Sequence, residues 1–109
     1  MPDAKLVVLY PQPTDAAKFD RDYFDDHIPL AASKSRGIAS HVAITKIQGA
    51  ANGQKPPYYL MFEAWFPSDE VMKNFLGSAD LAEVAAHAAS ISSGGEPVVL
   101  VSEETRQQL

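Results

Sequence analysis

Apolar and polar residues along this 109-residue chain fall into short, separate patterns, each typical of one kind of element. The run at residues 5–10 is short, apolar and stopped by Pro11, which favours a buried strand. Apolar positions then recur with a helical period from Thr14, a suitable N-cap, to Gly37, a suitable residue after a helix end. Residues 38–47 alternate and are rich in β-branched side chains, which predicts a second strand.

The rest of the chain completes a βαββαβ order. Two glycines and a Pro-Pro pair at residues 48–57 indicate a loop. A strand, two helical segments and a last strand are predicted at residues 58–66, 68–77, 78–92 and 97–102, respectively. Ser68 is the expected N-cap of the first of these helices. This order predicts an α+β, ferredoxin-like fold, in which helices cover one face of a four-stranded antiparallel sheet.

The strand at residues 58–66 is apolar on both faces. Tyr58, Leu60, Phe62, Ala64 and Phe66 alternate with Tyr59, Met61, Glu63 and Trp65. Helices cover only one face of such a sheet, and a large uncovered apolar face favours association. We therefore expect a homodimer that packs sheet to sheet about a two-fold axis.

Composition narrows the classes of function. The chain has 14 acidic and 9 basic residues, a formal charge of −5, and no cluster of Lys or Arg, which argues against nucleic acid or an anionic membrane surface as partner. The chain has no cysteine, which excludes a disulfide scaffold and a thiolate nucleophile. The apolar run near the N-terminus is too short for export, so we expect a cytoplasmic protein. We expect one domain, residues 1–109, with its core at about 5–103.

The first helical segment carries the candidate chemistry. Phe19, Tyr23 and His27 are spaced four residues apart, so they share one helix face. Pro29 lacks a backbone donor and crowds the carbonyl of Asp25, so we expect a kink with free backbone polar groups beside the imidazole and the phenol. A pocket can form at such a place.

These residues resemble the EthD family. The motif is Phe19-x3-Tyr23-Phe24-x2-His27-x-Pro29-Leu30, which follows the strand at Leu6 to Tyr10 and precedes Gly37. The resemblance extends from about residue 6 to about residue 103 and implies a dimeric α/β-barrel protein with a cleft between helices and sheet. Members are associated with ethyl tert-butyl ether degradation. Tyr23 and His27 also match two active-site positions of the similar methylmuconolactone methylisomerase, whose cysteine this chain lacks.

Each candidate has a functional and a structural interpretation. His27 is the predicted acid/base group, since an imidazole exchanges a proton near neutral pH; alternatively it bonds the backbone carbonyls freed near Pro29. Tyr23 is predicted to donate a hydrogen bond to a ligand oxygen; alternatively it is a core residue with a solvated hydroxyl. The predicted substrate-binding residues are Phe19, His41, Phe62 and Trp65. We expect Glu63 to be exposed or paired across the dimer interface, and His87 to be exposed.

Three functions remain open. The first is cofactor-free proton-transfer chemistry, of the isomerase, cyclase or dehydratase type, on a small, mostly apolar, oxygen-bearing molecule. The second is a non-catalytic ligand-binding or accessory role in an oxygenase pathway such as ether degradation. The third is cofactor-free monooxygenase or haem-linked chemistry. No cofactor and no metal site are predicted, because the three histidines lack a metal-ligand spacing.

Overall fold

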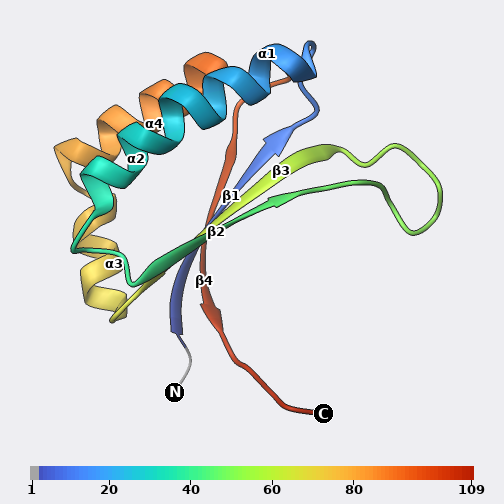
Figure 1. The fold of residues 1–109 in the computed structure, drawn as a ribbon. Helices are drawn as coiled ribbons and strands as arrows, with labels where there is room; N and C mark the ends of the chain where they lie inside the picture. Colours follow the sequence, from blue (N-terminus) through green and yellow to red (C-terminus); the bar gives the residue numbers. More distant parts are fainter. Residues whose placement is uncertain (1–2) are drawn as a thin grey trace.

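The computed structural model describes residues 3–109 as one four-stranded antiparallel sheet with helices on one side (Figure 1). The strands are β1 (Asp3–Pro11), β2 (His41–Lys46), β3 (Tyr58–Phe66) and β4 (Val98–Glu104). The helices are α1 (Ala16–Arg21), the π-helix η1 (Asp22–His27), α2 (Ile28–Ser35), α3 (Asp69–Leu76) and α4 (Ala79–Ile91). The strand order β2-β3-β1-β4 confirms the predicted ferredoxin-like arrangement.

The core lies between the sheet and the helices, and we call the strand face that it covers the inner face. At one end, Leu6, Ala64 and Phe66 pack against α3 through Met72 and Phe75. At the other end, the inner-face residues Tyr10 and Leu60 pack against α1, η1 and α4 through Phe19, Tyr23 and Ala88. Because side chains alternate along a strand, the odd-numbered residues of β1 between Lys5 and Leu9 face away from the helices.

The helix starts follow local capping. The first helical segment begins later than predicted because Asp15, not Thr14, is the N-cap: its carboxylate accepts a hydrogen bond from the Lys18 N–H at 3.1 Å. Ser68 is the N-cap of α3, as predicted, and its hydroxyl oxygen accepts from the Val71 N–H at 3.2 Å.

Three strands differ from their predicted bounds. β1 spans Asp3–Pro11 rather than residues 5–10, because pairing with its neighbouring strands continues at both ends. β2 starts at His41 rather than at residue 38, because the N–H groups of Ile38 and Ala39 donate to the Ser35 carbonyl and continue the turn after α2. β4 extends to Glu104 rather than ending at residue 102, since its last residues continue the pairing with β1.

A π-helical turn, η1, lies directly before the helix that contains Pro29. In η1 the hydrogen bonds are one residue wider than in an α-helix, and the Ile28 N–H donates to the Tyr23 carbonyl. Pro29 itself lies in the first turn of α2, where a missing backbone donor is tolerated. The turn leaves Tyr23 and His27 both buried. Gly37, with φ of 81°, follows the end of α2 as predicted.

The loop between α4 and β4 packs tightly on the end of β1. A Cβ atom at Gly94 would collide with the backbone carbonyl of Gln12, so this close approach requires glycine. The loop thereby brings Glu96 and Pro97 to the end of the sheet that holds Tyr10. Within residues 3–109 no helix combines the length and the apolar character needed to cross a membrane.

Candidate functional site

A cavity of about 290 Å³ lies between the inner face of the sheet and helices α2 and α4. Its floor consists of the inner-face residues Leu6, Val8 and Tyr10 of β1 and Phe62, Ala64 and Phe66 of β3. Alanines of α2 and α4 form much of the opposite wall, and small side chains there leave the space open. The polar side chains that line it are Tyr10, His27, Ser35 and Glu96. An apolar cavity with a few polar groups is typical of a small-molecule site.

His27 joins three elements at one end of this cavity. The π-helical turn buries its side chain, which is 4% exposed. Its Nε2 lies 3.4 Å from the Tyr10 hydroxyl on β1, and its Nδ1 lies 2.9 Å from Nδ1 of His87 on α4. Only one of the two Nδ1 atoms carries the hydrogen in such a bond, so the two imidazoles share one proton there. The tautomers of the two rings therefore determine whether neutral His27 presents a lone pair or an N–H at Nε2.

Burial keeps the side chains of His27, Tyr10 and Tyr23 uncharged at neutral pH. Burial, together with a smaller effect of the neighbouring His87, lowers the pKa of His27 to about 4. Burial raises the pKa of both Tyr10 and Tyr23 above the usual range for a phenol, so both hydroxyls stay protonated. The site thus offers hydrogen-bonding groups without a fixed charge beside His27.

Tyr23 lies against His27 rather than in the cavity lining. Its ring is stacked between Phe19 and His27, with centroids 5.6 Å and 5.4 Å away, and it meets the Tyr10 ring edge-on at 5.3 Å. The side chain is fully buried. Its hydroxyl has no hydrogen-bond partner among the residues that the structure describes. This hydroxyl is an unused donor in the same aromatic cluster.

The remaining predicted site residues divide between the two faces of the sheet. Phe19 is buried beneath Tyr23, and Phe62 lines the cavity. His41 and Trp65 lie on the opposite, outer face, where their rings stack at 4.4 Å. His41 also lines a smaller hollow of about 220 Å³ beside β2, which Phe62 reaches from the inner face. The structure therefore brings Phe19, Phe62 and His27 to one side and separates His41 and Trp65 from them.

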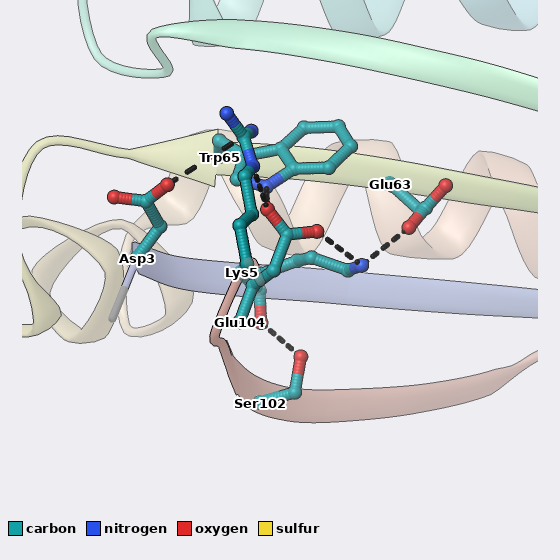
Figure 2. Close-up of polar contacts among 7 residues, drawn as sticks. Asp3, Lys5, Glu63, Trp65, Ser102 and Glu104 are labelled. Carbon is teal, nitrogen blue, oxygen red and sulfur yellow. Dashed lines mark hydrogen bonds and ion pairs between the residues drawn. The ribbon is translucent and has the colours of Figure 1, made fainter. Parts of the chain in front are cut away.

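A charged cluster on the outer face surrounds Trp65 (Figure 2). Lys5 lies 2.5 Å from Glu63 and 3.1 Å from Glu104, and the Trp65 Nε1–H donates to Glu104 at 3.0 Å. Glu63, which was expected to be exposed or paired across a dimer interface, is half-buried rather than exposed and pairs with Lys5 of its own chain. Hydrogen bonds from Trp65, Arg106 and Lys5 hold the pKa of Glu104 at about 2. Each charge in this cluster has a partner, so we assign the cluster to stability.

Two residues of the candidate site, His87 and Tyr10, were not predicted from the sequence. His87 was expected to be exposed, but it is half-buried and bonded to His27. A signal was present, because His87 follows Val84 and precedes Ile91 at helical spacing on the inward side of α4. Tyr10 was treated only as the last residue of a strand. The inward position of Tyr10 follows from its alternation with Leu6 and Val8 along the strand. Its contact with His27 cannot be predicted from that pattern.

The site has few groups suited to metal binding. Within residues 3–109, no three side chains of the His, Asp and Glu types converge. His27 and His87 come together, and a structural metal site usually has four such ligands.

The fold and this cavity define a ferredoxin-like α+β protein with a ligand-sized cleft between helices and sheet. The family model of the EthD domain matches residues 11–93, and the chain belongs to the EthD family.

Two relatives and one further structure with the same fold are similar to this chain. An uncharacterized 11.0 kDa protein of Rhodococcus erythropolis, from the thcB–thcC intergenic region, is 27% identical over 101 residues, which cover 93% of this chain and 95% of that protein. The crystal structure of an EthD family protein from Bacillus halodurans has a TM-score of 0.82 at 28% identity, covering 94% of this chain and 99% of that one. A dimeric ferredoxin-like protein from Thermobifida fusca, at 13% identity and a TM-score of 0.65, covers 92% of this chain and 89% of its own; it shows the fold alone.

Proposed function

We propose that this EthD-family chain binds a small, mostly apolar, oxygen-bearing organic molecule in the helix–sheet cavity. We further propose that His27 moves a proton on this molecule without a cofactor, as an isomerase, cyclase or dehydratase would. The observation that supports this most is the position of the Tyr10–His27 pair, 3.4 Å apart, at one end of an otherwise apolar cavity. Such convergent polar groups orient a ligand whose remaining surface is apolar.

The chemistry follows from the uncharged state of the pair. A neutral imidazole with a free lone pair at Nε2 accepts a proton from a carbon next to a carbonyl, and the Tyr10 hydroxyl donates to the carbonyl oxygen. The enolate that forms is negative, and its charge offsets the cost of a buried imidazolium. Tyr23 does not line the cavity, so in this proposal Tyr10 takes the donor role that was predicted for Tyr23, and the Tyr23 ring holds the His27 imidazole in place by stacking on it.

A binding role without catalysis is the second candidate. A pKa of about 4 makes His27 a weak base at neutral pH, whereas an efficient general base has a pKa near the working pH. This observation favours a ligand carrier or an accessory protein, such as one that supports an oxygenase pathway for ether degradation. The same cavity and the same polar pair would hold the ligand, but no bond would change.

Hydrogen–deuterium exchange distinguishes the two candidates without knowledge of the natural reaction. Neutral ketones are incubated with the protein in D₂O, and loss of the proton signal beside the carbonyl is followed by NMR. Proton transfer predicts exchange roughly 10²–10⁴ times faster than in buffer. The rate should fall to the buffer value in His27→Gln and stay unchanged in Ser33→Ala, an exposed position on α2.

Each outcome of the exchange experiment has a meaning. Saturable binding without exchange would support the carrier and overturn the catalytic proposal. Exchange that persists in His27→Gln would remove His27 from the reaction. Absence of both binding and exchange across the ketones would overturn the cavity as a ligand site.

We also propose that two copies associate through the outer face of the sheet. Beside the charged cluster, this face carries Val7, Leu9, Met61 and Leu100, and Leu100 is 45% exposed. An exposed apolar face on a small domain favours a second copy, and the similar Thermobifida fusca protein is dimeric. Sedimentation should give a particle of twice 11.8 kDa, and Leu100→Glu should shift it to the monomer. A monomeric wild type would contradict this proposal.

A further inference from the structure

We infer that the ligand of this cavity is a neutral amphiphile of about ten to twelve non-hydrogen atoms. Its oxygen-bearing head lies at Tyr10 and His27, and its hydrocarbon tail runs along β1 toward α3. The inference rests on the proposed ligand binding and is independent of the proposed proton transfer.

The cavity is elongated along β1. Leu6, Val8 and Tyr10 are successive inner-face residues of this strand, and all three line the cavity. Leu6 and Tyr10 are four positions apart, which corresponds to about 13 Å along a strand at about 3.3 Å per residue. A ligand that contacts both ends of this floor is therefore extended rather than compact.

Polarity falls along this direction. Tyr10 and His27 mark one end, and Glu96 lines the cavity from the loop that packs on the same end of β1. The Leu6 end is closed by Phe66, Phe75 and Leu81 and is apolar. One end thus binds an oxygen atom, while the other favours hydrocarbon.

The hydroxyl of Ser35 does not supply a second donor. Ser35 lines the cavity from the last turn of α2, and its hydroxyl donates to the Ala31 carbonyl at 2.7 Å, within the helix. Its proton is therefore already used. The ligand head therefore has its hydrogen-bonding partners at the Tyr10 end.

The volume sets the size of the ligand. An apolar cavity of about 150 Å³ in another protein binds benzene, which has six non-hydrogen atoms. This cavity, at about 290 Å³, is close to twice as large and fits roughly twice as many atoms. A ketone with nine to eleven carbons meets both the volume and the length.

The charges around the cavity favour a neutral head. Among the described residues, neither Lys nor Arg lines the cavity. Glu96, at the polar end, is an acidic residue, and the low pKa of His27 leaves the imidazole uncharged at neutral pH. An anionic head would lose its hydration without gaining an ion pair, so carboxylates and phosphates should bind poorly.

A homologous series of 2-alkanones, from 2-pentanone to 2-tridecanone, tests the inference by isothermal titration calorimetry at pH 7. The affinity should rise about fourfold with each methylene until the cavity is full, near 2-nonanone to 2-undecanone, and then level off. Decanoate should bind at least ten times more weakly than 2-decanone. Affinity that does not depend on chain length, or decanoate binding as tightly as the ketone, would overturn the inference.

Variants at the far end locate the tail. Leu81→Ala enlarges the apolar end and should move the plateau by about two to three methylenes toward longer ketones. Leu76→Ala is the matched control, because Leu76 packs against the same core cluster but does not line the cavity. Equal shifts in both variants would contradict the proposed tail position. The wild-type series decides the ligand class even if a variant is unstable, and deuterium exchange tests the chemistry separately.

Discussion

Acid should destabilise this protein through His27. Its pKa is about 4 in the folded chain and 6.5 in the unfolded chain, because burial and His87 disfavour the imidazolium. Between these values the unfolded chain binds a proton that the folded chain does not bind. The free energy of unfolding must therefore fall as the pH drops from about 6.5 to about 4, and His27 adds no further loss below that range.

The size of this effect follows from the pKa difference. A difference of about 2.5 units corresponds to about 3 kcal/mol between pH 7 and pH 4, since each unit is worth about 1.4 kcal/mol. This is a large share of the stability of about 5–15 kcal/mol that is typical of small proteins. Other groups also titrate in this range, so the contribution of His27 is the difference between wild type and a variant that lacks the imidazole.

Urea unfolding at pH 7, 6, 5 and 4, at one fixed protomer concentration, measures this difference. His27→Gln should lose about 3 kcal/mol less than the wild type over this range, whatever its stability at pH 7. Tyr23→Phe is the control, because it changes the same aromatic cluster without removing a group that titrates there, and it should keep the wild-type slope. Parallel curves for wild type and His27→Gln would refute the buried, neutral state of His27.

Three further predictions concern stability and the outer face. Leu60 is fully buried, so Leu60→Ala should lower the free energy of unfolding by about 2–5 kcal/mol in urea titrations. Gly37→Ala should cost about 1–2 kcal/mol, since φ is 81° there and a Cβ meets no other atom; an unchanged stability would contradict the backbone-strain explanation. Trp65→Phe should raise the pKa of Glu104 from about 2, because the indole N–H is the contact that lowers this pKa most. The carboxyl ¹³C chemical shift of Glu104 measured against pH checks this prediction.

The fold could be predicted where local signals are strong. β3 has its predicted bounds because proline stands on each side of an alternating run, and α3 begins after its Ser68 cap. β2 was predicted too long because β-branched composition does not show that Ile38 turns back to bond Ser35. The π-helical form of η1 has no sequence signal of its own, since Tyr23 and His27 also fit an α-helix.

The candidate site was less predictable because its contacts join distant elements. His27 could be identified from its spacing with Tyr23 on one helix face, but its bond to His87 spans 60 residues and depends on how α4 packs against η1. Trp65 and His41, both predicted to bind substrate, lie together. Alternation alone does not say which face of β3 the helices cover, and these two residues lie on the other face.

The side-chain nitrogen resonances of the three histidines test the central claim most directly. In a titration with 2-nonanone at pH 7, NMR should show saturable shifts for His27 and its partner His87, which lie at the polar end of the cavity. His41, on the outer face of the sheet, should not shift with the same saturation curve. Saturable binding that moves His41 and leaves His27 unchanged would contradict the account, because the ligand would then lie outside the helix–sheet cavity.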